Sequence, residues 1–328
     1  MQKGVDEARA NGADYVVVLS HLGEKSSIAH TSHDLVKGTR GIDVVLDAHS
    51  HTSIAQERVN NLDGKPVLIS QTGNKFKHIG KLLIKANGEM TTSLLPTQEI
   101  EQISPSVAQA VDDIQSQVAE QVKVVLCHSN YPLISLGPDK TPLSTTMETP
   151  IGDLVTDAFR HFHNADIAIH HGNSFATDLA SGDITKKDLM NLMPFEDKMF
   201  LIEVSGELLM SMLEQCTKNL PSKEIYFPQC SGLRYTVHQN SDAVTDVMVL
   251  DHESGDYQPL ELTKNYSVSL GTFYTNNGFY GILKDCKVLK ADKRSIRDAV
   301  EMYLTTALRG QLGDAYREPQ GRITIIDD

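Results

Sequence analysis

Three histidines near the beginning of the chain follow two apolar segments. His21 follows residues 15–19 (Tyr-Val-Val-Val-Leu), whereas His49 and His51 follow residues 44–47 (Val-Val-Leu-Asp). Runs rich in β-branched residues are typical of strands in α/β proteins, and we expect residues 15–19 to be buried on both faces of a sheet. Imidazole is a common ligand of Zn, Fe and Mn ions. The pattern predicts a transition-metal site; the alternative is that the imidazoles only hydrogen-bond at strand ends.

The two apolar segments are separated by a polar, helix-like stretch, residues 27–39. Strand–helix–strand units form parallel strands with right-handed crossovers. In such sheets the functional residues gather beyond the carboxyl ends of the strands. We therefore expect His21, His49 and His51 to converge at one edge of the first sheet.

Length and composition limit the classes of protein to be considered. The chain has 328 residues, which suggests roughly 100–200 residues in each of about two domains. Its net charge of −13 argues against a nucleic-acid polymer as partner, because polyanion binding needs a basic surface. No apolar run approaches the ~18 residues of a membrane span. The four cysteines lack C-x-x-C spacing and are expected as buried thiols, with a Cys216–Cys230 disulfide as the alternative: Cys127, Cys216, Cys230 and Cys286.

Periodicity divides the chain into a first domain at residues 1–103, a linker helix at 104–122 and a second domain at 123–328. Within the linker, apolar residues recur at three- and four-residue spacing, which predicts an amphipathic helix. In the second domain, the pattern predicts helices at 151–161, 208–215 and 296–308, and strands at 123–127, 266–270 and 322–326.

Two segments at the histidines and several farther along resemble a known family. Residues 14–23 and 43–52 resemble the last two metal-ligand segments of calcineurin-like metallophosphoesterases. Residues 149–160, 193–195 and 319–323 (Pro-Gln-Gly-Arg-Ile) occur in the order found in the C-terminal domain of 5'-nucleotidases. The resemblance covers nearly the whole chain. It implies an α/β fold, in which an N-terminally truncated metallophosphoesterase sandwich is followed by a 5'-nucleotidase C-terminal α/β domain.

The resemblance implies a two-metal phosphohydrolase that acts on nucleotides or related phosphate esters, with His21, His49 and His51 as ligands of Mn, Zn, Co or Mg ions. The family's D-x-H, G-D and G-N-H-E/D segments do not occur upstream of His21. We therefore expect an incomplete metal site and weak or no activity of this chain alone. The alternative is a non-catalytic nucleotide-binding or assembly module, completed by another chain or a second copy. A periplasmic or cell-surface location is implied by the resemblance only.

Two phenylalanines match the family's base-stacking pair, Phe195 and Phe273. Asn173 lies in the loop that corresponds to the family's N-x-G-G-x-R segment, where Ala176 replaces the substrate-binding arginine. Phe279 replaces the ribose-contacting aspartate. The resemblance therefore implies that Asn173, Phe195 and Phe273 bind a nucleotide or nucleoside; the alternative is that both phenylalanines are core residues.

Overall fold

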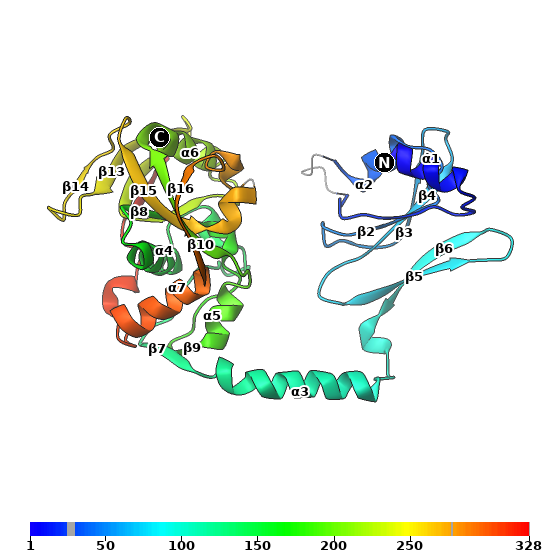
Figure 1. The fold of residues 1–328 in the computed structure, drawn as a ribbon, viewed down its shortest axis with the longest axis horizontal. Helices are drawn as coiled ribbons and strands as arrows, with labels where there is room; N and C mark the ends of the chain where they lie inside the picture. Colours follow the sequence, from blue (N-terminus) through cyan, green and yellow to red (C-terminus); the bar gives the residue numbers. More distant parts are fainter. Residues whose placement is uncertain (25–29, 277, 328) are drawn as a thin grey trace. The chain divides into compact units, whose positions relative to one another are not determined.

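The computed structural model describes residues 1–24, 30–276 and 278–327, and the chain divides into two compact units, Met1–Asp112 and Asp113–Asp328 (Figure 1). The division falls inside helix α3 (Pro105–Val122). The linker helix is therefore confirmed as a helix, whereas the proposed domain boundaries stay a prediction. No side chain of α3 is buried, so its apolar stripe, which includes Val107, Val111, Ile114 and Val118, is exposed.

The first unit is built on a four-stranded sheet of order β1-β2-β4-β3. Its first three strands in this order are parallel, and β3 is antiparallel to β4, with bounds β1 Val17–Leu19, β2 Val44–Asp47, β4 Pro66–Thr72 and β3 Ser53–Asn60. Helices α1 (Gln2–Ala10) and α2 (Ser32–Lys37) supply Val5 and Val36 to a core shared with the sheet. A hairpin of β5 (His78–Ile84) and β6 (Met90–Pro96) packs against β3 and β4.

The prediction that residues 15–19 form a strand buried on both faces is wrong. Strand β1 is only three residues long and lies at the edge of the sheet. Val18 is buried in the helix-covered core, whereas Leu19 is 80 % exposed. An edge strand has a neighbour on one side only, and here only one face is covered. The helix predicted at residues 27–39 is shorter and begins after Thr31, whose side chain caps it together with Asp34. Residues 27–29 lie outside the described residues.

The second unit contains two larger sheets. In the five-stranded sheet, of order β11-β8-β15-β10-β16, only the β8–β15 pair is parallel. Its strands are β11 Pro228–Ser231, β8 Ile167–His171, β15 Asn265–Gly271, β10 Lys198–Ser205 and β16 Lys287–Ser295. The four-stranded sheet has the order β14-β13-β12-β17, with β14 Tyr257–Pro259, β13 Ala243–Leu250, β12 Leu233–His238 and β17 Ile323–Ile326. A separate pair joins β7 Val125–Ser129 and β9 Gly182–Thr185.

Alternate residues of β8 face two apolar cores. Ile167 and Ile169 belong to the core that also contains α6 (Gly206–Thr217) and the four-stranded sheet. Ala168 belongs to the core that contains α4 (Pro150–His163) and α7 (Ile296–Met302). The five-stranded sheet is thus covered on both faces, as period-two side-chain alternation requires.

The remaining helix is α5 Lys186–Leu192, and the short helical turns are η1 Thr97–Glu99, η2 Leu143–Thr145, η3 Gly172–Ser174, η4 Thr272–Asn276, η5 Gly278–Gly281, η6 Tyr303–Ala307 and η7 Asp314–Tyr316.

The cysteines are free thiols, so the alternative Cys216–Cys230 disulfide is not formed. Cys127, Cys216 and Cys230 are buried as predicted, and Cys286 is half-buried. Within the described residues, no helix combines the length and apolar character needed to cross a bilayer.

Candidate functional site

The first candidate site is the histidine edge, which we define as residues 20–22 and 47–51. Strands β1 and β2 are parallel, with Leu19 paired with Leu46, so both strands end at this edge. The rings of His21 and His49 meet edge to face there, with 5.1 Å between ring centroids and an interplanar angle of 63°. All three predicted ligands, His21, His49 and His51, are exposed. The backbone of His49 and His51 is left-handed, at φ 79° and 58°, which is uncommon outside glycine.

Asp47 connects the two strand ends. Its Oδ1 accepts hydrogen bonds from the Ser20 hydroxyl at 2.7 Å and from the Leu22 amide at 3.0 Å. Burial raises the pKa of Asp47, but the hydrogen bonds from Ser20 and Leu22 outweigh this effect, so the pKa lies below its ordinary value. Asp47 is therefore a carboxylate at neutral pH. Its second oxygen, Oδ2, is buried and has no hydrogen-bond partner within the described part of the chain.

Among the residues that the structure describes, this edge holds no group of three possible metal ligands. His51 has a partner other than the two rings, because Asn74 Nδ2 lies 3.4 Å from His51 Nδ1. In residues 1–24, 30–276 and 278–327, no three His, Cys, Asp or Glu side chains are grouped so that they could hold a metal ion. The structure thus brings His21 and His49 together at the two strand ends that Asp47 joins. The assignment of all three histidines as metal ligands stays a prediction.

The second candidate site is the aromatic edge of the five-stranded sheet, defined by Asn173, Phe195 and Phe273 with His171 and Tyr226. Parallel strands β8 and β15 both end there. The antiparallel neighbours begin there, because Met199 of β10 pairs with Gly271 and Pro228 of β11 pairs with His171. Segments from His171 to Phe273 of the chain are therefore gathered at one edge, including all three residues predicted to bind substrate.

The backbone around Phe195 is held while its ring remains accessible. Arg297 Nη1 donates to the carbonyl oxygens of Met193 at 2.8 Å and Phe195 at 3.1 Å. Two residues on, the Thr272 hydroxyl donates to Asp197 at 2.9 Å, which joins this loop to the segment that carries Phe273. The Phe195 side chain is 61 % exposed, so the alternative of a core residue is wrong for Phe195.

Phe273 is half-buried and meets two rings that the sequence did not single out. Its ring contacts His171 edge to face, at 4.2 Å between centroids, and lies 5.9 Å from Tyr226. Burial lowers the pKa of His171 to about 4, so this imidazole is neutral at pH 7. Its Nδ1 is buried without a hydrogen-bond partner among the residues that the structure describes. Asn173 is exposed in turn η3, two residues after His171, and the double histidine before Gly172 was the sequence signal for this contact.

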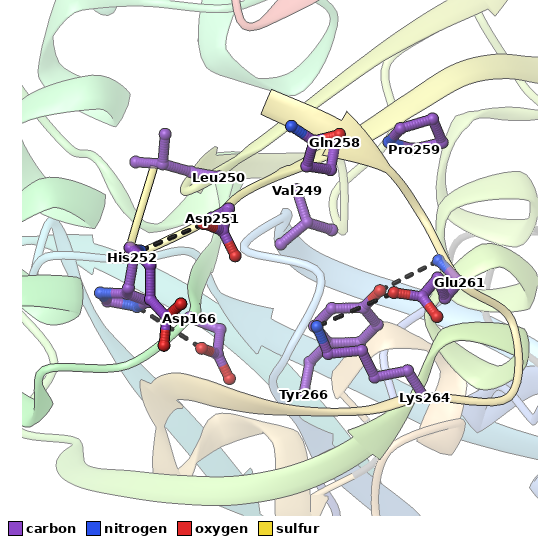
Figure 2. A pocket seen from close by; sticks show the side chains of 11 residues that line it. Asp166, Val249, Leu250, Asp251, His252, Gln258, Pro259, Glu261, Lys264 and Tyr266 are labelled. Carbon is purple, nitrogen blue, oxygen red and sulfur yellow. Dashed lines mark hydrogen bonds and ion pairs between the residues drawn. The ribbon is translucent and has the colours of Figure 1, made fainter. Parts of the chain in front are cut away.

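A further pocket lies away from the predicted residues. It is a cavity of about 280 Å³. Its lining includes Asp166, Asp251, His252, Glu261 and Lys264 (Figure 2). Two of its acidic side chains have partners: Asp166 accepts from the Ser267 amide and hydroxyl and lies 3.4 Å from His252 Nε2, while Glu261 lies 3.9 Å from Lys264 Nζ. These contacts pair four of the cavity's charged groups with one another.

Comparison with known proteins shows what the chain is similar to. Residues 136–284 match the model of the 5'-nucleotidase C-terminal domain. The trifunctional nucleotide phosphoesterase protein YfkN of Bacillus subtilis (strain 168) is 25 % identical over 276 residues, which is 80 % of this chain and 18 % of that protein. Protein 5NUC of Lutzomyia longipalpis is 21 % identical over 368 residues, covering 97 % of this chain and 61 % of its own length. The chain thus spans less than two thirds of these curated relatives.

Among solved structures, the 5'-nucleotidase precursor from Thermus thermophilus matches 100 % of this chain and 67 % of its own, with a TM-score of 0.66 and 23 % identity. At this identity the likeness shows a shared fold. The α/β fold class predicted from the sequence is therefore confirmed.

Proposed function

We propose that the chain, as a member of the 5'-nucleotidase family, acts in the hydrolysis of nucleotide phosphoesters, with its second unit holding the nucleoside part of the substrate. One observation carries the proposal. The strand registers of the five-stranded sheet gather Asn173, Phe195 and Phe273 at one edge, and the Phe195 ring is exposed there on an anchored loop. Aromatic side chains bind flat bases by stacking, which contributes about 1–3 kcal/mol per base.

Members of the family generally use divalent metal ions. When bound, such ions polarise phosphoryl oxygens and supply a nucleophilic hydroxide at neutral pH. We propose that His21, His49 and His51 contribute ligands for Mn, Zn, Co or Mg ions, and that Asp47 holds the two strand ends in place by its bonds to Ser20 and Leu22. Because no three ligands are grouped within the described residues, we expect this chain alone to turn over nucleotides weakly or not at all.

Nucleoside binding by the aromatic edge is tested by calorimetric titration of the full chain with adenosine and with AMP. Loss of one stacking partner in Phe273→Ala is expected to weaken binding about 5- to 150-fold, which corresponds to about 1–3 kcal/mol. Phe76→Ala is the matched control, because Phe76 belongs to the first unit and its side chain is 92 % exposed. An affinity for adenosine that Phe273→Ala leaves unchanged would refute the role of the aromatic edge.

A second candidate function is nucleotide binding without hydrolysis, which the lack of a three-ligand group in the described residues favours. Phosphatase assays with Mn²⁺, Co²⁺, Zn²⁺ or Mg²⁺ against a panel of nucleotides separate the two functions. Binding without turnover would support the non-catalytic alternative. Metal-dependent turnover that disappears in His49→Ala would show that this chain is an active phosphohydrolase and that our expectation of weak activity is wrong.

A further inference from the structure

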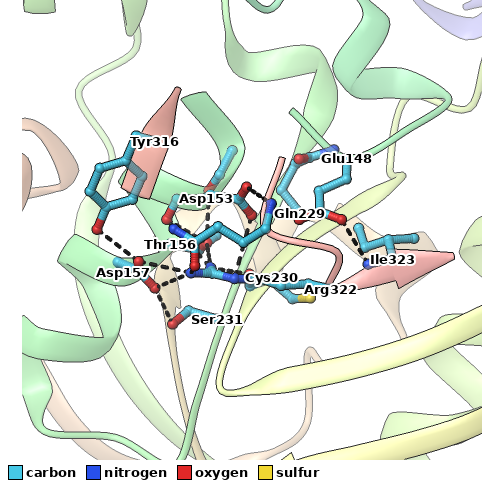
Figure 3. Close-up of polar contacts among 12 residues, drawn as sticks. Glu148, Asp153, Thr156, Asp157, Gln229, Cys230, Ser231, Tyr316, Arg322 and Ile323 are labelled. Carbon is cyan, nitrogen blue, oxygen red and sulfur yellow. Dashed lines mark hydrogen bonds and ion pairs between the residues drawn. The ribbon is translucent and has the colours of Figure 1, made fainter. Parts of the chain in front are cut away.

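Four charged side chains of the second unit meet in a buried group, which we call the carboxylate cluster: Glu148, Asp153, Asp157 and Arg322 (Figure 3). Arg322 is 6 % exposed and Asp153 is 1 % exposed. Arg322 Nη2 lies 2.8 Å from both carboxylate oxygens of Asp157, and its Nε lies 3.5 Å from Asp153 Oδ1. The cluster therefore holds one positively charged guanidinium and three carboxyl groups.

Hydrogen-bond donors account for four of the six carboxyl oxygens. Asp157 accepts from the Ser231 hydroxyl at 2.5 Å and from the Tyr316 hydroxyl at 2.8 Å. Two backbone amides that flank Arg322 supply the other donors: Gln320 N–H to Asp153 Oδ2 at 3.1 Å, and Ile323 N–H to Glu148 Oε2 at 2.8 Å. The segment that leads into strand β17 is thus attached to the protein through Glu148, Asp153 and Asp157.

The other two carboxyl oxygens, Glu148 Oε1 and Asp153 Oδ1, are buried, and no hydrogen bond from a donor within the described residues reaches them. Glu148 is nevertheless the neighbouring carboxyl that raises the pKa of Asp153, through its charge and as a hydrogen-bonding side chain. Two carboxylate oxygens are both acceptors, so only a retained proton can join them. The place for a retained proton is therefore between the carboxyl groups of Glu148 and Asp153.

Two further cations lie nearby but outside the buried group: half-buried Arg160 lines a cavity with Asp157, and exposed Arg317 lines one with Glu148. The buried titratable groups that face the cluster are Cys230 on β11, Tyr235 on β12, Tyr303 in η6 and Tyr316 in η7, and burial raises the pKa of each, so all four are neutral. With three ionised carboxylates and one guanidinium, the cluster would hold a net charge of −2 away from water, which is strongly unfavourable. Burial raises the pKa of Asp153 to about 8; Arg322 opposes this rise and Glu148 adds to it.

We propose that Glu148 and Asp153 share one proton, and that this bond is a pH-sensitive latch that fastens residues 319–326 to the N-terminal part of helix α4. The latch acts through the protein's own backbone, because the amides of Gln320 and Ile323 are bound by the same two carboxyl groups. It is independent of nucleotide binding and of metal ions.

The direction of the pH effect follows from the two states of Asp153. Its folded-state pKa, about 8, lies above the ordinary value of 3.8, so the closed form binds a proton that the open form releases. The stabilisation is complete below the ordinary pKa and is lost as the pH rises to about 8. Opening of residues 319–326 is thus expected to become about tenfold easier per pH unit between roughly pH 6 and 8, and then to level off.

Hydrogen exchange of the Gln320 and Ile323 amides in the full chain, measured from about pH 6 to 9 and corrected for intrinsic exchange, tests the latch. In the wild type the opening constant should rise about tenfold per pH unit up to about pH 8. In Asp153→Asn it should be independent of pH, because a side-chain amide donates to Glu148 at every pH. The same slope in Asp153→Asn as in the wild type overturns the proposal.

Two further variants separate the latch from a merely structural role. Asp157→Asn should weaken protection at every pH but keep the slope, because both Asp157 oxygens already have donors. Glu148→Gln should remove the slope, and it replaces Asp153→Asn if that variant does not fold.

Infrared spectra at about pH 7 give a second readout: a protonated-carboxyl stretch should be present in the wild type and absent in Asp153→Asn. Its absence from the wild type would also overturn the proposal.

Discussion

Replacing Arg322 by glutamine tests how far the second unit depends on one buried cation. Arg322 makes the two bonds to Asp157 at 2.8 Å, one to the Cys230 carbonyl at 2.7 Å and one to the Gln320 side chain at 2.8 Å. A glutamine is shorter and uncharged, so Asp157 would remain in its largely buried site without a counter-ion. Removing one partner of a buried ion pair typically costs about 3–5 kcal/mol.

For a unit of this size, about 1 kcal/mol shifts the Tm by roughly 2–4 °C, so Arg322→Gln should lower the Tm by roughly 6–20 °C. Near-ultraviolet circular dichroism of the full chain follows this unit, because Tyr235 and Tyr274 are among its fully buried side chains. The matched control is Arg317→Gln, whose side chain is exposed in the same segment, with an expected change within about 0.5 kcal/mol. If the two variants unfold at the same temperature, the buried cluster does not hold this unit together.

Two substitutions test the packing that positions the candidate sites. In Gly172→Ala, the added Cβ would lie 1.7 Å from the Ser144 carbonyl oxygen, so turn η3 must move. We expect the free energy of unfolding, measured by urea denaturation, to fall by more than about 2 kcal/mol. An unchanged free energy of unfolding would refute this close packing. Ile69 is fully buried in the first unit and Leu19 is 80 % exposed, so Ile69→Ala should cost about 2–5 kcal/mol and Leu19→Ala less than about 0.5 kcal/mol. Equal losses in the same denaturation assay would mean that the Leu19 side chain is covered in solution.

Much of the local structure was predictable because its causes are local. The helix expected at residues 151–161 is α4, Pro150–His163, where Thr149 caps the helix and proline occupies its first position. The strand expected at 266–270 is β15, Asn265–Gly271. Parallel pairing of β1 with β2 was also predictable, since the connection between them has the length and pattern of a crossover.

The helix expected at residues 296–308 shows where a local pattern was insufficient. Its α-helical part ends at Met302, and residues 303–307 continue as a π-helical turn. There the Tyr303 hydroxyl pairs with Tyr316 at 2.9 Å, and Tyr316 in turn reaches Asp157 on α4. Apolar spacing records which side of a helix is buried, but not the polar contacts that its last turn makes.

By itself, the sequence determined the strand–helix–strand pattern of the first unit and the order of motifs that the chain shares with 5'-nucleotidases, because periodicity, caps and motif order are properties of neighbouring residues. Only the tertiary structure decided which groups are exposed and which groups meet. It placed Leu19 on an uncovered edge, set His171 against Phe273, and closed Arg322 among three carboxyl groups from 165 to 174 residues earlier in the chain. The burial of a side chain, and the electrostatic effects of that burial, depend on residues that are distant in the sequence and pack against it. A pattern of neighbouring residues does not contain this information.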